Sequence, residues 1–470
     1  MTVTVTATSK KDPTKTASAT VNVVAPGQVA PTANVQVALY TIAPAGAGNV
    51  SVQFGLDTNY GLTTWTQPVP AGGGAVPIFV AGMKANTLYH MRGVVQFGDG
   101  TQFMDADQTF TTGAIPAAQL PNITATTTAG MTPQSGVEML DLINFSGSTA
   151  LSGVITDLNG NVLWAYDPGT SVPAGVSIQP VKLLPNGHFL FTFTVSTAGL
   201  ASSSVLQEVD LTGSVVWQMT SAQLNQALAA SCAASGIGCN LTILGTHHDF
   251  VLLPNGHLIL IADTNQFISG TTVNGDVLID LDENHKPVWL WNEFDHLDIN
   301  RRPMGFPDWT HTNAVIYSAD DGNLIISIRH QNWLVKVDYA NGTGAGDILW
   351  KLGYQGDFAL LNADGTADTN AADWFFAQHG PSFVSTNTTG KFSLVLYPTA
   401  PTYSFFGGNA AVLKNGNVEF CESAGGPGTA GDIYEVTQDS SAQTVWHMLI
   451  TGQFAYRGQR IPSFYPGVQW

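Results

Sequence analysis

The sequence predicts an all-β protein: a six-bladed β-propeller preceded by an immunoglobulin- or fibronectin-like β-sandwich module. Three observations point to this fold class. Val, Ile, Thr and aromatic residues recur in short runs, stretches with helical periodicity are scarce, and one strand–turn–strand unit recurs through the second part of the chain. With 470 residues, 44% of them hydrophobic, the chain can bury two or three separate cores.

Two β segments precede the repeats. Residues 1–28, with the runs TVTVTATS and TASATVNVVAP, are predicted to be remnant strands of an upstream immunoglobulin-like repeat. Residues 29–114 alternate polar and apolar in runs such as VQVALYTI and LYHMRGVVQF, separated by Gly, Pro and Asn, which predicts the sandwich. The segment AIPAAQLPN combines two prolines with small residues and is predicted to be a linker. Residues 115–470 then form the propeller.

The repeat is a hairpin built on Asn-Gly or Asp-Gly, which supplies the positive φ angles of a tight turn. A third strand and a fourth that ends at tryptophan follow each hairpin; the half-unit VITDLNGNVLW comes first, and a shorter unit, GKFSLVLYPTA, lies near 390–400. The full hairpins are VKLLPNGHFLFTFT (181–194), DFVLLPNGHLILIA (249–262), YSADDGNLIISI (317–328) and AAVLKNGNVEFCE (410–422). Together with the half-unit and the shorter unit, the four full units favour a propeller of six blades, closed by shared strands, over one of five or seven. A β-solenoid would need shorter repeats.

The charge balance limits the partners. A net charge of −18, with 16 Lys and Arg residues against 34 Asp and Glu residues, argues against nucleic acid and against an anionic membrane surface. No apolar run has the length that spans a bilayer, so no membrane insertion is expected. An anionic substrate group must therefore be held by local donors.

The cysteines and the N-terminus bear on the compartment. Cys232 and Cys239 could close a short loop through a disulfide, and Cys421 is expected to be a buried thiol. The protein is expected to be periplasmic or secreted, with a signal segment removed upstream of this chain.

The repeat separates structural histidines from functional candidates. His188 and His257 follow Asn-Gly at the position where Asn323 and Asn417 stand in other units, so a turn-stabilising role explains all four. A structural role is also expected for the histidines of the module, the loops and one strand end, which are His90, His285, His296 and His447.

The remaining histidines stand, with an arginine and an asparagine, in GTHHDF (245–250), WTHTNAV (309–315), SIRHQNW (327–333) and FFAQHGPSF (375–383). Because side chains alternate across a strand, His311 and Asn313 are expected to share a face, whereas Arg329 and His330 point apart. Three interpretations stay open: a metal site, structural histidines bonded to backbone carbonyls, or a nucleophilic imidazole with an anion clamp. The metal interpretation lacks a nearby His-x-His or His-x-x-x-His cluster with a carboxylate.

At these motifs the chain resembles the bacterial arylsulfate sulfotransferases that do not use phosphoadenylyl sulfate. The resemblance covers roughly residues 120–470 and rests on the LLPNG hairpins, HHDFVLLPNGHLILI, DWTHTNAVIYSADDGNLIISIRHQNWLVKVD with the following ILWKLG, QHGPSF and YRGQRIPSFYPG. It implies a propeller enzyme that moves a sulfuryl group from an aryl sulfate ester to a phenol. The implied route is ping-pong through a sulfated histidine, with no metal or other cofactor.

By motif position, the resemblance implies that His379 is the nucleophile. It implies that His311 and His248 exchange protons with the phenol, and that Arg329 and Asn313 donate hydrogen bonds to the sulfuryl oxygens. The implied partners are small aryl sulfates and phenols. The sandwich module could position the propeller or support a homodimer.

Several alternatives stay open. In the doublet His247–His248, strand alternation lets one ring face the channel, and His248 is preferred. A non-catalytic propeller could bind sulfated or glycosylated ligands, and a sulfatase-like hydrolase could use water in place of the phenol. A propeller glycosidase is disfavoured, because the candidate positions are basic or amide residues and Asp249 alone does not make a carboxylate pair.

Overall fold

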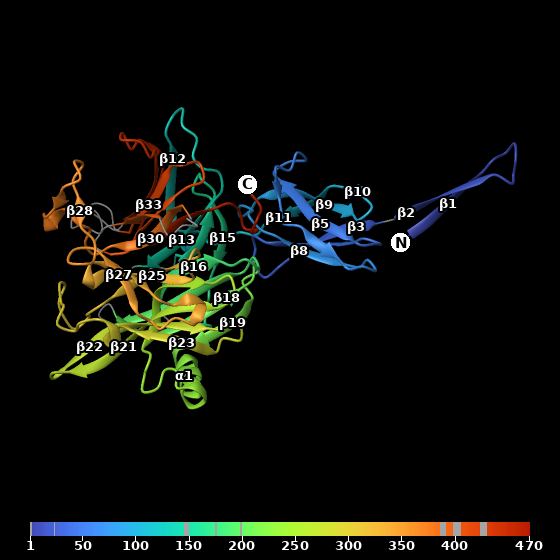
Figure 1. Cartoon of the computed structure of the whole chain (residues 1–470). Coiled ribbons are helices and arrows are strands. Elements are labelled where there is room, and N and C mark those ends of the chain that lie inside the picture. The colour runs from blue at the N-terminus through green and yellow to red at the C-terminus, as the bar shows by residue number, and fades with distance from the viewer. Residues whose placement is uncertain are drawn as a thin grey trace.

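The computed structural model describes residues 2–22, 24–144, 150–173, 176–197, 200–385, 392–397, 406–423 and 430–470. Figure 1 shows a large body of strands, a smaller strand module beside it, and a thin N-terminal hairpin that extends away from the module. Strands account for most of the regular structure, so the predicted all-β class is confirmed. Among the helices within these ranges, none combines the length and the apolar character that crossing a membrane requires.

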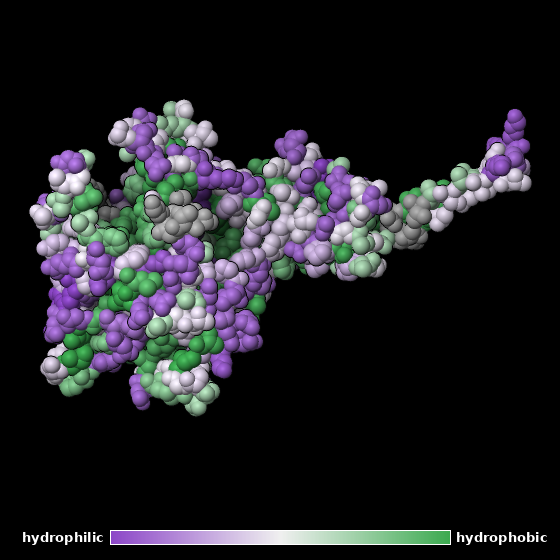
Figure 2. Space-filling model, in the orientation of Figure 1, coloured by the Kyte–Doolittle hydropathy of each residue, from purple (hydrophilic) through white to green (hydrophobic). Residues whose placement is uncertain are grey.

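The N-terminal hairpin consists of β1 (Thr2–Thr8) and β2 (Thr16–Asn22). Its antiparallel register places Val5 opposite Ala19, and the alternation of side chains makes one face of the hairpin apolar. Val5 is 55% exposed, and the space-filling view shows this arm standing clear of the module (Figure 2). Strands are therefore present within residues 1–28, while their origin in an upstream repeat stays a prediction.

The module consists of two antiparallel sheets that share one core. The first sheet has the order β3-β4-β8, and the second has the order β10-β9-β5-β6, with β7 paired to β5 and β11 paired to β9. The strands are β3 (Ala25–Pro31), β4 (Ala38–Ala43), β5 (Gly48–Gly55), β6 (Leu62–Thr63), β7 (Gln67–Val69), β8 (Val76–Val80), β9 (Leu88–Phe97), β10 (Gln102–Met104) and β11 (Gln108–Thr111). Tyr40, Val52 and Ile78 are buried between the sheets, as a sandwich requires.

The large body contains five antiparallel sheets of four or five strands and the two-stranded sheet β30-β31, besides the small hairpin β28-β29, within the described ranges. Its first strands are β12 (Asn122–Thr127), β13 (Val137–Asn144), β14 (Gly153–Thr156), β15 (Val162–Tyr166), β16 (Ser177–Leu183), β17 (Phe189–Thr197), β18 (Leu200–Val209), β19 (Val215–Thr220), β20 (Gly245–Leu252), β21 (Leu258–Ile268), β22 (Thr271–Leu281) and β23 (Pro287–Asn292). The others are β24 (Thr312–Ser318), β25 (Asn323–Ile328), β26 (Trp333–Val337), β27 (Ile348–Leu352), β28 (Leu360–Leu361), β29 (Ala367–Asp368), β30 (His379–Ser385), β31 (Ser393–Tyr397), β32 (Asn409–Val412), β33 (Val418–Glu422), β34 (Ala430–Val436), β35 (Thr444–Thr451) and β36 (Gln453–Ile461).

The order of these strands is propeller-like. Three sheets, β16 to β19, β20 to β23 and β24 to β27, are each built from four consecutive strands. The short unit expected near 390–400 supplies β31; its residues 390–391 and 398–400 lie outside the described ranges.

The predicted turns anchor the hairpins. The turn residues Gly187, Gly256, Gly322 and Gly416 all have positive φ, between 72° and 87°. His188 Nδ1, one residue after its turn glycine, lies 2.6 Å from a carboxylate oxygen of Glu208 on the third strand of its sheet. The residues at the equivalent position, His257, Asn323 and Asn417, likewise contact groups on or just after the third strand. These contacts are structural, as predicted from the repeat.

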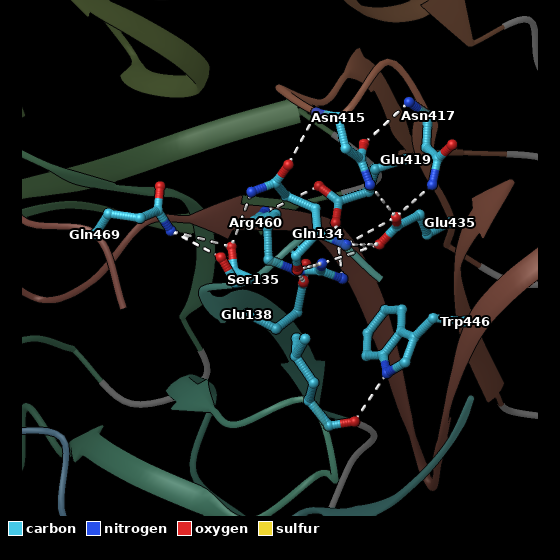
Figure 3. A network of polar contacts seen from close by, with 11 residues as sticks. Gln134, Ser135, Glu138, Asn415, Asn417, Glu419, Glu435, Trp446, Arg460 and Gln469 are labelled. Atoms are coloured by element: carbon cyan, nitrogen blue, oxygen red, sulfur yellow. Dashed lines mark hydrogen bonds and ion pairs between the residues drawn. The ribbon is translucent and has the colours of Figure 1, made fainter. Parts of the chain in front are cut away.

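Shared strands join the two ends of the body. β12, the first strand after the module, pairs with β35, and the C-terminal β36 pairs with β13. Arg460 of β36 bridges this seam (Figure 3): it donates to Glu138 Oε2 at 2.8 Å and to Glu435 Oε2 at 3.0 Å, and lies 3.5 Å from Glu419 Oε1. The closure that the sequence predicts is therefore present.

Within the described ranges two α-helices interrupt the strands, the long α1 and the short α2 (Glu293–His296), in line with the expectation that helical stretches are scarce. α1 (Ser221–Ser235) follows β19 and begins with a capping box, in which the Thr220 side chain accepts from the N–H of Gln223 and the Gln223 side chain accepts from the N–H of Thr220. Cys232 in its last turn forms a disulfide with Cys239, so the expected bridge is confirmed. Cys421 is a buried thiol, also as expected.

The C-terminal tail lies between the module and the body (Figure 1). Tyr465 Oη donates to the carbonyl of Phe79, and Trp470 Nε1 donates to the carbonyl of Thr63, each at 2.9 Å. Buried residues of both parts belong to one hydrophobic cluster, and Gln36 of the module donates to the carbonyl of Val162 in β15 at 2.8 Å. The module is thus packed against the first sheet of the body.

Candidate functional site

The five residues singled out from the sequence lie at the starts of neighbouring sheets. His248 lies in β20, Asn313 lies in β24, and His379 begins β30. His311 directly precedes β24, and Arg329 begins a single 3-10 turn after β25. Since β20, β24 and β30 are the first strands of three successive sheets, the fold places these side chains close together.

Histidine rings form the centre of the cluster. The ring of His311 lies between two others: its centroid is 4.7 Å from that of His248 and 4.6 Å from that of His330, on which it stacks. His248 also packs edge-to-face on Tyr456 of β36. We call the group of His247, His248, His311, His330 and His379, with Arg329, the histidine cluster.

The backbone is irregular where it carries this cluster. The register of β20 with β21 shifts between Thr246 and Phe250, and that of β24 with β25 shifts between Thr312 and Ala314. His248 and His311 have φ angles of 61° and 52°, a left-handed conformation that non-glycine residues rarely adopt. Such strain is found most often at functional sites.

These irregularities change how two adjacent pairs of residues lie, compared with a regular strand. His247 and His248 both belong to the cluster, because their Nδ1 atoms lie 2.5 Å apart. Arg329 and His330 lie on a 3-10 turn rather than a strand, and Arg329 Nη1 lies 2.6 Å from His330 Nε2. The period of two does not hold at a bulge or in a helical turn. Arg329 and His330 therefore meet, whereas His248 contacts His311 and His247 turns its Nε2 to Asp263 and Asp276.

The His311–Asn313 pair also departs from a regular strand, since His311 precedes β24 with positive φ. Asn313 is fully buried, and its Nδ2 donates to the carbonyl of Gln378 at 2.7 Å, while its Oδ1 has no hydrogen-bond partner. Gln378 precedes His379, so Asn313 helps to hold the segment that carries the histidine.

Two backbone contacts define the tautomer of His379. Its Nδ1 lies 3.1 Å from the carbonyl of Ala377, which can only accept, and its Nε2 lies 3.2 Å from the N–H of Gly407, which can only donate. Nδ1 therefore carries the proton and Nε2 the lone pair. Burial, together with the charges of Arg329 and His311, holds the pKa of His379 well below its usual value. The ring is a neutral imidazole at neutral pH.

His311 has a carboxylate partner that the sequence analysis missed. Its Nδ1 lies 2.6 Å from Asp308 Oδ2, while His330 Nδ1 donates to the backbone carbonyl of Asp308 at 2.8 Å. Burial alone would raise the pKa of Asp308, but the hydrogen bond from His311 brings it below its usual range. An ionised Asp308 thus keeps the proton of His311 on Nδ1 and leaves Nε2 free to exchange a proton.

Arg457 of β36 is the second missed residue. Its Nη1 lies 3.1 Å from Asp249 Oδ1, and its Nη2 donates to the carbonyl of Asn313 at 3.0 Å. Burial lowers the pKa of Arg457, but the neighbouring Asp249 more than compensates, so the guanidinium stays charged. Arg457 and Asp249 both line a cavity of about 240 Å³, together with Lys182 and Asp141. Two arginines in one short stretch, in a chain with few basic residues, were the signal available in YRGQR.

Among the residues that the structure describes, two groups have ligand atoms close enough to hold a metal ion: Asp308, His311 and His330, and a buried group of His247, Asp263 and Asp276. In the first group both nitrogens of His330 are engaged, Nδ1 by a carbonyl and Nε2 by Arg329, which leaves a weak donor set. In the second group His247 Nε2 lies at ion-pair distance from both carboxylates.

The chemistry of the site therefore suits an anion. Arg329 and Arg457 supply positive charge from two directions, and His379 supplies a neutral nitrogen with a lone pair. A family model for arylsulfotransferases (ASST) matches residues 125–398, which is more than half of the chain. The chain belongs to the arylsulfotransferase family. This membership supports aryl sulfotransferase activity, with aryl sulfates and phenols as fitting substrates.

Other comparisons add little to the family match. No curated protein matches the sequence. A mutant of the Synechocystis apocarotenoid oxygenase is 11% identical with a TM-score of 0.31, covering 94% of this chain and 96% of its own. A Bacteroides uniformis protein proposed to be a 6-phosphogluconolactonase is 9% identical with a TM-score of 0.33, covering 88% and 99%. We draw no functional argument from likenesses at this level.

Proposed function

We propose that this protein transfers a sulfuryl group from an aryl sulfate ester to a phenol, by a ping-pong route through a sulfated His379 and without phosphoadenylyl sulfate. The observation that carries the proposal is the neutral His379, whose Nε2 lone pair lies beside the charges of Arg329 and Arg457 in a member of the arylsulfotransferase family. A neutral imidazole is a nucleophile, and two guanidinium groups can hold the oxygens of the group in flight.

In the first half-reaction, His379 Nε2 attacks sulfur, and the S–O bond to the aryl group breaks with its electron pair on the phenolate oxygen. The Gly407 N–H that contacts Nε2 must release the lone pair before attack. Arg329 and Arg457 donate to the sulfuryl oxygens, where negative charge shifts. His248 or His311 protonates the phenolate.

In the second half-reaction, the histidine that protonated the phenolate, His248 or His311, takes the proton of the acceptor phenol, and the phenol oxygen attacks sulfur. The N–S bond breaks, and His379 returns to its neutral form. Asn313 contributes by one free N–H of its amide and by holding Gln378. Atoms and charges balance over the two steps without a cofactor or a metal ion.

The wider assignments are part of the same proposal. The domains are 1–28, the remnant strands; 29–114, an immunoglobulin- or fibronectin-like sandwich; and 115–470, a six-bladed propeller with β30-β31 as a short blade. The Cys232–Cys239 disulfide supports a periplasmic or secreted location, since such bonds persist in oxidising compartments. A homodimer is a further proposal, which sedimentation can check.

The decisive experiment mixes the purified protein with 4-nitrophenyl sulfate, with and without phenol. We expect release of 4-nitrophenol that depends on phenol, and a gain of one sulfuryl group in the intact mass of the donor-only sample. His379→Ala should show neither. His188→Ala removes a histidine of the hairpin repeat and should behave as the wild type.

The alternatives give different results in the same experiment. Release that does not need phenol would identify a sulfatase-like hydrolase. Absence of release and of any mass gain across several aryl sulfates would identify a binding propeller, whose ligand would be sought among sulfated and glycosylated compounds.

A further inference from the structure

A buried group of three side chains lies directly behind His248. His247, Asp263 and Asp276 are each at most 5% exposed, and His247 Nε2 lies 3.0 Å from Asp276 Oδ1 and 3.3 Å from Asp263 Oδ1. Neither His247 Nε2 nor Asp276 Oδ1 has a well-aligned hydrogen bond to another group. The sequence analysis preferred His248 to His247 for the site, and the proposed mechanism does not use His247.

The two carboxylates are held by other elements. Asp276 Oδ2 accepts hydrogen bonds from the hydroxyl of Thr310 and from the N–H of Thr312, both at 2.7 Å. Asp263 Oδ2 accepts from the N–H of Ala201 at 2.7 Å. Donors of this kind favour the ionised carboxylate and fix its position; at Asp263 the Ala201 N–H and His247 oppose the burial that raises its pKa. A ring nitrogen that faces two such carboxylates carries a proton, so His247 has Nε2–H.

The other nitrogen of His247 faces its neighbour. His247 Nδ1 and His248 Nδ1 lie 2.5 Å apart, and the two rings are perpendicular. Two nitrogens at this distance share one proton between them. The proton belongs to the ring whose cationic form is better stabilised.

The surroundings favour His247 as the cation. Burial would lower its pKa, but Asp263 and Asp276 raise the pKa well above the usual value. Burial and the charges of His311 and His247 lower the pKa of His248 well below that value. The titratable and charged groups around the two rings are Asp263, Asp276, Glu293, Asp308, His311, His379, Tyr456 and Arg457.

We propose that His247, held between Asp263 and Asp276, donates its Nδ1–H to Nδ1 of His248 and thereby keeps His248 in the Nε2–H form as the proton donor to the leaving phenolate. His247 is thus a positioning residue and the second member of a proton relay. The inference rests on the proposed sulfuryl transfer and names which nitrogen of which ring supplies the proton.

The relay balances in both directions. As the S–O bond breaks, His248 Nε2–H passes its proton to the phenolate oxygen, and His248 Nδ1 takes the proton of His247 Nδ1. The imidazolium and the phenolate both become neutral, and His247 keeps its Nε2–H toward the carboxylates. In the second half-reaction the acceptor phenol returns a proton to His248 Nε2, and the proton on His248 Nδ1 goes back to His247.

The first test measures protonation directly and needs no activity. In the wild-type protein with ¹⁵N-labelled histidine, we expect His248 to show an unprotonated Nδ1 and a protonated Nε2 near neutral pH, and His247 to show two protonated nitrogens. Asp276→Asn should remove the charge of His247. A protonated Nδ1 on His248, or a neutral His247 in the wild type, would overturn the inference.

The second test measures the first half-reaction in single turnover with phenyl sulfate and with 4-nitrophenyl sulfate. Because 4-nitrophenolate leaves without help from an acid, His247→Gln should slow its release by less than about 3-fold, but should slow phenol release by about 10²-fold. His188→Gln removes a histidine that contacts the carboxylate of Glu208 within the sheet β16 to β19, beside the sheet that carries His247. This substitution should change neither rate. Equal losses with both donors would show that His247 acts only in folding and would overturn the relay.

Further outcomes separate the hypotheses. A stoichiometric metal ion in the purified protein, lost with activity on chelation, would assign His247, Asp263 and Asp276 to a metal site and overturn the relay. If the wild type transfers no sulfuryl group but shows the expected protonation, the proposed function fails while the arrangement of the two rings stands. If the wild type transfers sulfuryl groups but His248 Nδ1 is protonated or His247 is neutral, the proposed function stands and the relay fails.

Discussion

Two regions of the body bury charge, and they use it differently. Around Arg460, three glutamates from neighbouring strands surround one guanidinium, and β36 pairs regularly with β13 through residues 137–141. In the histidine cluster, His248 and His311 have positive φ, and the strands that carry them are bulged. In the first region regular strand pairing closes the body. In the second region an irregular backbone brings side chains from different strands together.

The two regions also balance their buried charges differently. In the Arg460 group, burial raises the pKa of Glu138 and Glu419, while the amide groups of Asn417 and Asn415 help to lower the pKa of Glu435. Near the histidine cluster, Asn313 Oδ1 and Arg457 Nε are buried without a partner. The Arg460 group also keeps buried atoms without a hydrogen bond, Arg460 Nη2 and Glu419 Oε1, but these two lie 3.5 Å apart as an ion pair, so that group balances its charges internally.

The largest effect is expected from His379→Ala, which should abolish sulfuryl transfer without unfolding the protein. His379→Ala should reduce sulfuryl transfer by at least about 10⁴-fold, because it removes the nucleophile of both half-reactions. The melting temperature should stay within about 2 °C of the wild type, since an alanine can replace a neutral ring without leaving an unpaired charge. Steady-state kinetics and thermal unfolding check this; a variant that melts much earlier would break the contrast between the two regions.

Arg460→Met should have the opposite effect, lowering stability while leaving sulfuryl transfer by the folded protein nearly unchanged. It leaves Glu138 and its two neighbours without their cation, and we expect it to lower the free energy of unfolding by about 3–5 kcal/mol. Below its melting point the folded fraction should transfer sulfuryl groups at nearly the wild-type rate. Lys84→Met is the control, because it breaks a partly exposed ion pair with Asp157 and should cost less than about 1 kcal/mol.

A third prediction concerns Asp141, which lies between the two regions. Burial raises its pKa to about 7, so the folded protein holds a proton that the unfolded chain releases near pH 4. Relative to Asp141→Asn, the wild type should lose stability as pH rises from about 4 to about 7, by up to about 4 kcal/mol, and should then level off. Chemical unfolding of both proteins across this range measures the difference; parallel curves would contradict the shift.

A smaller effect is expected from Asp308→Asn. The amide cannot hold the His311 proton on Nδ1 as the carboxylate does, and we expect transfer to fall by about 10²-fold with little change in unfolding. Asp107→Asn is a matched control, because Asp107 makes the same contact, at 2.7 Å, with His90 in the module. Equal effects of the two substitutions would remove Asp308 from the mechanism.

The smallest effect concerns the Cys232–Cys239 disulfide, which belongs to neither region. The bond closes a loop with a sequence separation of 7, and its loss should cost about 2 kcal/mol. Thermal unfolding of Cys232→Ser with Cys239→Ser measures this cost. Transfer at 25 °C should be unchanged; a loss of activity would tie α1 to the site.

Much of the fold follows from local sequence. The Asn-Gly and Asp-Gly turns specify hairpins because few other dipeptides accept positive φ, and the hairpin number leads to the sheets that the structure contains. The helix α1 could have been found from the same kind of signal, since Thr220 and Gln223 have the spacing of a capping box. The apolar residues of α1 recur only weakly at helical spacing, so the sequence analysis missed this helix.

The sequence by itself determined which residue types are available to the site, through the motifs around His248, His311, Arg329 and His379. Tertiary structure alone decided how they meet. Alternation along a strand is a local rule with a period of two, and it fails at bulges, whose positions depend on packing between strands. For the same reason Asp308, Arg457 and the pairing of His247 with Asp276 became visible only in the folded protein, where distant segments are neighbours.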